Sequence, residues 1–480
     1  MKSISANKWA HEEFGATPLG DVRRTRRLVD MAARAARRPS GKVAVVFDDK
    51  SNREGAYDFL ESPHVDAGAV AGSMFAATAA RAEGETVVFV ALDTSMLTLT
   101  DVDEAKGFGP IGSPNRPARG LMVMNALAVD PDGVPLGLID QRFWVRPDPS
   151  RGTIAERTER NRHRPFDDKQ GAFFVRAAQA AIERLQAVKV VPWFVIDREG
   201  DNRNILQALN GMANAFTIRG TKNRCLTSRE EERTVRESVA RQPVLATDSV
   251  RLSTRGEHMA RVATVAVRAK QVELRLRRNP LDPSSPLKLY AVVVRETRAD
   301  GRREDALDWL LYTNAPVTTE EDALRVVRSY RSRWRVEEFH RTWKQGGCNV
   351  ETAQLRSVDA VVKWATILSA VAVRIERLKY LSRNTPDAPA TIELDPTEIE
   401  ALKIERKSRY PGKPAPRLDM LTIAVATAWI AEMGGWMGQK SSGPPGSITI
   451  ARGLQVLAIY TKALVDARSE LTTRRRKPRR

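Results

Sequence analysis

Two runs of apolar, mostly β-branched residues constrain the fold of this chain more than any other feature. The first is TVVFVALDTS at 86–95, and the second is VKVVPWFVIDREGD at 188–201. Such continuous runs are typical of strands that are buried on both faces of a sheet. The first strand is predicted to end at Asp93 and the second at Asp197. The sequence therefore predicts an interior sheet in which two buried strands each end in an aspartate.

The segments around these runs alternate between strand and helix signals. Runs at 120–129 and 134–145 flank Asp-Pro-Asp-Gly, which predicts a hairpin between two further strands. Residues 169–186 have helical period, residues 213–315 are predicted to be mostly β, and helices resume at Glu320. A chain of 480 residues corresponds to more than one domain.

A third carboxylate is needed, because an aspartate at a strand end is more often a cap or turn residue than a metal ligand. The segment SYRSRWRVEEFHRTWKQGG at 329–347 supplies one if it forms a helix. Four polar side chains then fall within an arc of roughly 60° along about 21 Å of axis: Tyr330, Arg333, Glu337 and Lys344. Three apolar side chains lie on the opposite side and should pack on the core: Val336, Phe339 and Trp343. The spacing favours Glu337 over Glu338, which lies about 100° further round.

Three carboxylates would form a site for divalent cations. Hard Mg²⁺ prefers carboxylate oxygens, and two ions can activate an attacking oxygen and stabilise a leaving oxygen at phosphorus. With Glu337 completing the site, Arg333, Lys344 and the Tyr330 hydroxyl would hold phosphate oxygens beside it. The competing interpretation is a surface helix joined by salt bridges, and the stripe alone does not separate the two.

Positive charge indicates a polyanionic partner. Lys and Arg number 78 against 59 Asp and Glu, which gives a net charge of +19. In LGDVRRTRRLVDMAARAARR at 19–38, Leu28, Met31 and two alanines recur at helical spacing while the arginines can project elsewhere. Such a helix packs on a core and presents cations to phosphates, although a solvated face fits the same pattern. The basic tail RRRKPRR at 474–480 adds DNA affinity or only solubility.

The cysteine content and the apolar runs indicate the cellular compartment in which the protein works. Cys225 and Cys348 show no metal-ligand spacing, which argues against a disulfide framework and a structural zinc site. The N-terminus lacks the apolar stretch of a secretory signal, and the run at 361–373 is too short to span a bilayer. We therefore expect a soluble, cytoplasmic protein. His340, adjacent to the stripe, is expected to support or pack rather than to react.

These residues together resemble a known family. Asp93, Asp197 and the Tyr-x2-Arg-x3-Glu-x6-Lys signature from Tyr330 to Lys344 resemble the DDE transposases of the bacterial IS-four group, and the Tn-five-type transposases in particular. Further similar segments are LGDVRRTRRL, EGAYDFL, LDTS, DRE, DWLLYT, YRSRWRVEEFHRTWK and AVAVRIERL. The resemblance extends over nearly the whole chain, and the segment 213–305 and the part past about 385 match mainly in order and length.

The resemblance implies an α/β (α+β multidomain) fold with an RNase H-like catalytic core. This core would occupy 71–375 and contain the mostly β insertion at about 213–315. An N-terminal helical DNA-binding domain at 1–70 and a C-terminal helical dimerisation domain with the basic tail at 376–480 would flank it. The resemblance further implies that Asp93, Asp197 and Glu337 ligate two Mg²⁺ or Mn²⁺ ions.

DNA contacts are implied in the same way. Arg23, Arg24 and Arg27 would touch the terminal inverted repeats of a transposon, and Arg219 in FTIRGTKNR would contact a phosphate beside the active site. Trp309 in DWLLYT would stack on a flipped base, for which roughly 1–3 kcal/mol is available. From the residues alone, a core strand position is the preferred interpretation of Trp309.

The implied activity is cut-and-paste transposition by a homodimer in a synaptic complex. Water nicks the transposon end, the freed 3′-hydroxyl attacks the opposite strand to make a hairpin, a second water opens the hairpin, and the same hydroxyl attacks target DNA. Two alternatives stay open: an RNase H-like endonuclease without strand transfer, and a non-catalytic transposase-derived DNA-binding protein. A glycosidase is remote, because paired-carboxylate sugar chemistry does not call for a charge of +19.

Overall fold

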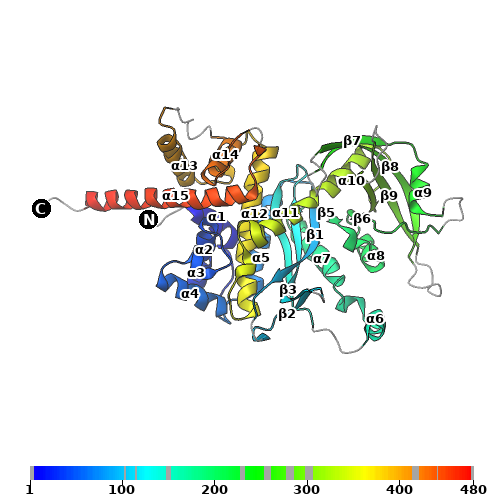
Figure 1. Ribbon diagram of the computed structural model, residues 1–480, viewed down its shortest axis with the longest axis horizontal. Helices are drawn as coiled ribbons and strands as arrows, with labels where there is room; N and C mark the ends of the chain where they lie inside the picture. The colour runs from blue at the N-terminus through cyan, green and yellow to red at the C-terminus, as the bar shows by residue number, and fades with distance from the viewer. Residues whose placement is uncertain are drawn as a thin grey trace.

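Helices from both ends of the chain gather at one end of the molecule, and the outer strands lie at the other (Figure 1). The long helix α12 (Val358–Asn384) stands between them. Helices α1 and α2 contact α13 and α15, so the two ends of the sequence are neighbours in space. The computed structural model describes residues 5–101, 104–113, 116–147, 153–227, 233–252, 261–276, 286–297, 306–412, 421–439 and 442–476.

Five helices build the N-terminal part of the chain. They are α1 (Ser5–Phe14), α2 (Val22–Arg37), α3 (Val43–Val46), α4 (Lys50–Glu61) and α5 (Ala67–Ala82). Asp21, Asp49 and Asp66 accept hydrogen bonds from free backbone N–H groups at the starts of α2, α4 and α5. The predicted apolar face of α2 is buried, with Leu28 and Met31 in the core, and this confirms the expected helix.

A ten-stranded sheet forms the centre of the described part. Its strands are β1 (Val87–Thr98), β2 (Gly109–Ser113), β3 (Arg116–Val129), β4 (Pro135–Trp144), β5 (Val191–Ile196), β6 (Phe216–Arg219), β7 (Ala246–Leu252), β8 (Arg261–Arg275), β9 (Pro286–Glu296) and β10 (Asp308–Thr313). Their order is β2-β3-β1-β5-β6-β10-β9-β8-β7, with β4 paired to β3. Antiparallel β4, β3 and β1 are followed by parallel β5 and β6, which is the RNase H-like arrangement that was expected.

The strand that carries Asp93 is longer than expected, so the prediction that it ends there is wrong. Its parallel pairing with β5 stops at Leu92 and Ile196, but its antiparallel pairing with β3 continues through Asp93 to Thr98. The end of the apolar run marks the point where β1 loses its pairing with β5, not the end of the strand. The second run does end as predicted, at Ile196 directly before Asp197.

The mostly β insertion continues the catalytic sheet and does not form a sheet of its own. Strand β10 pairs antiparallel with β6, and β9, β8 and β7 follow outward. Helix α9 (Val235–Ala240) packs against β8 and β9. Parts of the expected insertion lie outside the described residues: 228–232, 253–260, 277–285 and 298–305.

Helices cover both faces of the sheet. The remaining elements are α6 (Ile154–His163), η2 (Phe166–Asp168), α7 (Ala172–Gln186), η3 (Arg198–Gly200), α8 (Arg203–Gly211), α10 (Glu320–Ser332), α11 (Trp334–Arg341), η4 (Thr342–Gly346), η5 (Val350–Thr352), η6 (Ala390–Ile392), α13 (Pro396–Arg409), α14 (Ile423–Met433) and α15 (Ser447–Arg476). Val88, Val90 and Leu92 of β1 share a buried cluster with α7 and α8. Phe89 and Ala91 share the opposite cluster with α10, α11 and α12. Alternate residues of β1 are thus buried on opposite faces, as the apolar run predicted.

Residues 329–347 do not form one continuous α-helix, so that expectation is wrong. Helices α10 and α11 are separated at Arg333, and α11 passes into the π-helical turn η4. A π turn holds more residues than an α turn, so side chains after α11 are rotated away from the predicted stripe. The buried Trp343 lies in this turn and donates its indole N–H to the carbonyl oxygen of Ala365 at 3.0 Å.

The expected domain limits fall inside continuous helices. Residues 70 and 71 belong to α5, and residues 375 and 376 belong to α12. Twenty of the 27 residues of α12 are buried, and the helix packs against α2, α4, α5, β4, α14 and α15. The division into 1–70, 71–375 and 376–480 therefore stays a proposal about the function of each part. In the structure, helices α5 and α12 cross these limits, so the parts share one core.

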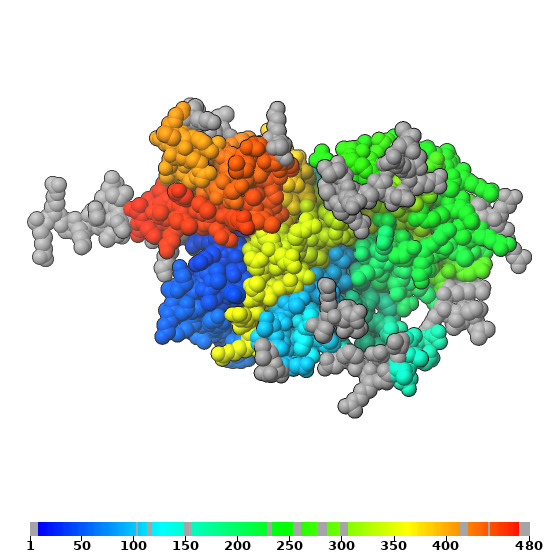
Figure 2. Space-filling view, viewed as in Figure 1, coloured from blue at the N-terminus to red at the C-terminus, as the bar shows by residue number. Residues whose placement is uncertain are grey.

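Helix α15 projects beyond the rest of the protein (Figures 1 and 2). By length and composition its segment Ser447–Ser469 could cross a membrane, and 33% of the apolar stretch is buried inside the protein. One such helix is weak evidence for a membrane span, because helices that pack on protein have the same composition. Residues 474–476 of the expected basic tail continue α15, and 477–480 lie outside the described residues.

Candidate active site

The two strand aspartates lie side by side where the parallel pairing of the sheet ends. Leu92 and Ile196 are the last residues paired between β1 and β5, and Asp93 and Asp197 follow them directly. Adjacent strands are about 4.8 Å apart, so the two carboxylates arise from neighbouring positions. Asp197 also caps the turn η3, because its Oδ1 accepts a hydrogen bond from the backbone N–H of Glu199 at 2.8 Å. The structure brings together the two aspartates that the sequence singled out.

The pKa of Asp93 reflects its burial and the charges around it. Burial, followed by the negative charge of Asp197, raises this pKa to about 8. Glu199 and Glu337 add to the increase, and the positive charge of Arg333 opposes it. The carboxylates therefore repel one another, and a divalent cation among them would remove that repulsion.

Glu337 reaches this edge from α11. Its Oε1 accepts a hydrogen bond from the Arg333 guanidinium at 2.5 Å, and about a third of its side chain is exposed. Val336 and Phe339, its apolar neighbours on α11, are fully buried, as the sequence predicted. Helix α11 thus anchors itself on the core while it presents Glu337.

The donor set suits a hard divalent cation. Asp93, Asp197 and Glu337 offer only carboxylate oxygens, which Mg²⁺ and Mn²⁺ prefer. Within the described ranges, no three acidic, histidine or cysteine side chains lie close enough to hold one metal ion. Glu337 is held by Arg333 instead. A cation at this site therefore competes with Arg333 for Glu337.

Four of the predicted DNA-contact residues form one cluster of rings and guanidinium groups. The rings of Trp309 and Tyr330 meet edge to face with 5.0 Å between their centroids. The guanidinium carbon of Arg219 lies 5.9 Å from each ring, and that of Arg333 lies 5.8 Å from the Tyr330 ring. Trp309 is half-buried on β10, whereas Tyr330 is only 7% exposed. Tyr330 is thus packed within a cluster and not spread along an open helix face.

Lys344 is held differently from the other members of the predicted stripe. It lies in the π turn η4, and its Nζ pairs with Glu351 at 3.4 Å. Glu351 in turn accepts a hydrogen bond from the backbone N–H of Thr98, at the end of β1. The structure therefore ties Lys344 to the end of the Asp93 strand rather than aligning it with Arg333.

A buried polar network lies behind Asp93. Nδ1 of His340 is 3.8 Å from the carboxylate of Asp93, and its Nε2 accepts a hydrogen bond from the amide of Asn125 at 2.9 Å. The amide of Gln141 donates to the Asn125 oxygen at 2.8 Å. Burial, with smaller contributions from the charges of Lys344 and Arg333, lowers the pKa of His340 to about 3, so the ring is neutral.

Sequence reasoning gave His340 a supporting position, and the geometry agrees with it. Asn125 and Gln141 were missed. The available signal was the single amide that interrupts the apolar run at 120–129, because a buried polar group requires hydrogen-bond partners.

The predicted end-binding arginines lie on a separate surface, on α2. Arg23 is highly exposed and pairs with Asp21 at 2.9 Å. Arg24 donates to the carbonyl oxygen of Leu19 at 3.0 Å, and Arg27 donates to the side chain of Asn52. Arg23 is therefore the most accessible of the three, while Arg24 and Arg27 also brace α2 against its neighbours.

A cavity of about 420 Å³ lies away from these carboxylates, between α1, α5, α12 and α13. Most of its charges are already paired within the protein. The pairs are Glu13 with Arg81, Arg374 with Glu398, and Arg377 with Glu393. This cavity is a charged junction between the helices of the two chain ends.

Known protein families match three successive parts of the chain. Residues 6–65 match the Transposase DNA-binding family. Residues 175–374 match the Transposase DDE domain, a range that contains Asp197 and Glu337 and begins after Asp93. Residues 370–474 match the Transposase Tn5 dimerisation domain. The three matches follow one another in the order that the resemblance implied, and this chain therefore belongs to the Tn5-like DDE transposases.

Proposed function

We propose that this DNA transposase acts by cut-and-paste transposition, with Asp93, Asp197 and Glu337 as its catalytic carboxylates. The observation that carries the proposal is the pairing register of β1 and β5, whose last pair, Leu92 and Ile196, is followed directly by Asp93 and Asp197. The influence of Glu337 on the pKa of Asp93 supports its membership of the same site. DDE transposases as a family generally use divalent metals.

In this proposal, Asp93, Asp197 and Glu337 hold two Mg²⁺ or Mn²⁺ ions. When bound, such ions lower the pKa of an attacking water and stabilise charge on the leaving oxygen. The protein's own cations hold the DNA. The guanidinium groups of Arg219 and Arg333 match the geometry of phosphate oxygens, and Lys344 adds a point charge. The Tyr330 hydroxyl supplies a further hydrogen bond.

Each proposed step exchanges one oxygen for another at phosphorus. Hydrolysis nicks the transposon end and frees a 3′-hydroxyl, which displaces an oxygen at a phosphodiester of the opposite strand and closes a hairpin. A second hydrolysis opens the hairpin, and the same hydroxyl then attacks target DNA. Trp309 stacks on a base that is flipped out during hairpin formation. Its half-buried position beside Arg219 supports this role.

The partners follow from the family matches. DNA and a second copy of the chain are the partners of a DNA-binding and a dimerisation domain. More specifically, we propose that the α2 surface with Arg23, Arg24 and Arg27 reads terminal inverted repeats. Target DNA enters as a second duplex, and the homodimer forms in the synaptic complex. The proposed location is the bacterial cytoplasm, at the nucleoid.

The decisive experiment uses duplexes that carry the inverted repeats flanking the gene. Purified protein with Mg²⁺ or Mn²⁺ is expected to give nicked, then hairpin-ended, then joined strands on denaturing gels. Nicked strands without hairpins or joined products would indicate an endonuclease. Binding without any cutting would indicate a non-catalytic DNA-binding protein.

A further inference from the structure

Helix α11, which carries Glu337, is a short helix with interruptions at both ends. The break at Arg333 precedes it, and the π turn η4 follows it. The regular α-helical bonding pattern changes at both junctions, while Arg333 keeps helical backbone angles and its carbonyl oxygen accepts a hydrogen bond from the N–H of Val336 at 3.1 Å. Side-chain contacts therefore add to the backbone bonds in setting how α11 is turned, and with it the direction of Glu337.

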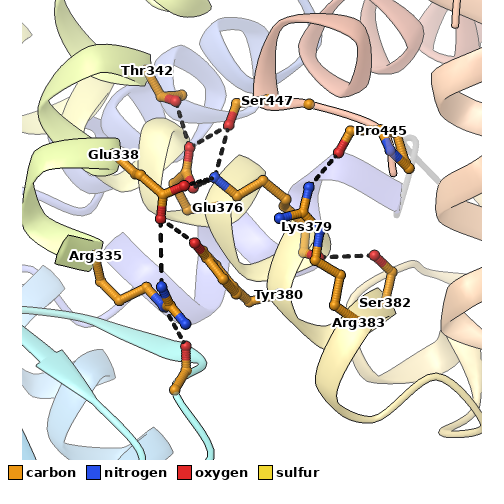
Figure 3. A network of polar contacts seen from close by, with 12 residues as sticks. Arg335, Glu338, Thr342, Glu376, Lys379, Tyr380, Ser382, Arg383, Pro445 and Ser447 are labelled. Carbon is orange, nitrogen blue, oxygen red and sulfur yellow. Dashed lines mark hydrogen bonds and ion pairs between the residues drawn. The ribbon is translucent and has the colours of Figure 1, made fainter. Parts of the chain in front are cut away.

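The next residue of α11 supplies such a contact (Figure 3). The carboxylate of Glu338 accepts a hydrogen bond from Lys379 Nζ at 3.0 Å and another from the hydroxyl of Tyr380. Arg335 lies with its guanidinium 3.7 Å from the centroid of the Tyr380 ring. It also donates to the carbonyl oxygen of Gly133 at 2.8 Å. Helix α11 is thereby tied to α12 and to the β3–β4 turn.

The same contacts continue to the first residue of α15 (Figure 3). Lys379 pairs with Glu376 at 2.5 Å and donates to the hydroxyl of Ser447 at 3.2 Å. Ser447 donates to Glu376 at 2.6 Å, and Thr342 of the π turn donates to the same carboxylate oxygen at 2.5 Å. Elements α11, η4, α12 and α15 therefore meet on the carboxylates of Glu338 and Glu376.

These charged groups are almost withdrawn from water. The side chains are 16% exposed for Glu338, 5% for Lys379 and 1% for Glu376. Burial alone would raise the pKa of Glu338, but Lys379, Tyr380 and Arg335 outweigh it and lower the pKa. Removing one partner from such a set leaves a buried charge uncompensated. Ser447 and Glu338 are therefore linked through the buried Lys379, which donates to both.

We propose that Glu338, Lys379 and Ser447 form a positioning network that couples the seating of α15 to the orientation of Glu337. The inference rests on the proposed role of Glu337 as a metal ligand. Helix α15 lies within the dimerisation match up to residue 474, so docking of a second copy acts on the helix that begins at Ser447. In the single chain, Glu337 is held by Arg333. Seating of α15 in the dimer sets the affinity of the site for metal.

The first test measures the nicking rate of end DNA as a function of Mn²⁺ concentration. Glu338→Gln and Ser447→Ala are expected to raise the half-saturating Mn²⁺ concentration about tenfold, the size of effect typical for residues that orient metal ligands. Binding of end DNA stays unchanged, and Lys379→Arg, which keeps the charge, retains more activity than Lys379→Met. The exposed residues Glu320 and Ser442 provide the matched controls Glu320→Gln and Ser442→Ala.

A purely structural role would lower the melting temperature of the variants without changing their Mn²⁺ dependence, and that result would overturn the proposal. A second readout does not require activity. Ser447→Ala, which removes a single hydroxyl, is expected to speed hydrogen exchange of the α11 amides at 334–341, whereas Ser442→Ala is not. Equal exchange in both variants would also overturn it. If the wild-type protein cuts no DNA, the proposed function fails, while hydrogen exchange still decides the coupling.

Discussion

Glu337 is the single residue on which the proposed chemistry depends most directly. Glu337→Ala removes one of the three carboxylates that we propose as metal ligands and leaves the α2 arginines in place. We expect the nicking rate to fall about a thousandfold, because several kcal/mol of stabilisation is lost and each 1.4 kcal/mol is about tenfold. End-DNA binding stays nearly intact. Single-turnover cleavage and gel-shift titration measure the two, and Glu320→Ala is the control. Equal loss of both would contradict a metal-ligand role.

Arg23 gives a second prediction for a single side chain. Its side chain is 86% exposed, while Asp21 keeps its hydrogen bond to the backbone at the start of α2. Arg23→Ala is therefore expected to weaken end binding without loss of the helix cap. The slope of log affinity against log salt concentration should fall by about 1, as for one lost phosphate contact. Arg409→Ala on α13 is the comparison, and an unchanged slope for Arg23→Ala would exclude that contact.

Individual site residues could be predicted where the spacing of nearby residues in the sequence determines their position. Asp93 and Asp197 follow apolar runs, and the helical spacing separates Glu337 from its neighbour. The network behind Asp93 could not be predicted in this way. Asn125 and His340 come from β3 and α11, and their hydrogen bond exists only after tertiary packing. A sequence pattern identifies these side chains, but it does not show which of them contact one another in the fold.

At the scale of elements, the predictions failed where a neighbouring element decides the backbone. Strand β1 continues to Thr98 because β3 is there to pair with it. The π turn η4 coincides with the burial of Trp343 against α12, a contact that helical period does not contain. The continuation of the sheet from β6 into β10 likewise depends on the order of the strands in space, which the local sequence does not determine. The order and type of the elements were predicted more successfully than their limits.

Helix α12 holds the end of α4 through one buried cation, and this gives an element-scale prediction. Lys363 is fully buried and donates to the carbonyl oxygens of Leu60 and Ser62 at 3.0 and 2.9 Å. Lys363→Met leaves these acceptors without their donor. We expect the free energy of unfolding to fall by about 1–3 kcal/mol in urea denaturation. Lys462→Met on the exposed face of α15 should be neutral, and equal stability of the two variants would show that other donors replace Lys363.

At the scale of the whole molecule, the exposed apolar residues of α15 bear on assembly. Ile459 is 69% exposed, and it lies within the dimerisation match. Ile459→Asp is expected to raise the dimer dissociation constant at least about tenfold, because burying an isoleucine contributes roughly 1.5–3 kcal/mol. Sedimentation of the DNA-bound protein measures this. Val244→Asp, at a 46% exposed position outside the dimerisation match, is the control. A dimer unaffected by Ile459→Asp would place the interface elsewhere.

The buried helix α12 also restricts how a lineage of such transposases can change. It packs at once against helices of the segment that matches the DNA-binding family, against strand β4 of the central sheet and against helices of the dimerisation match. Recombination that exchanged only one of these parts with a relative would leave a face of α12 without its matching surface. We therefore expect new DNA-binding specificities and new dimer pairings to arise more readily by point substitution on outward faces, such as the arginine face of α2, than by shuffling of whole modules.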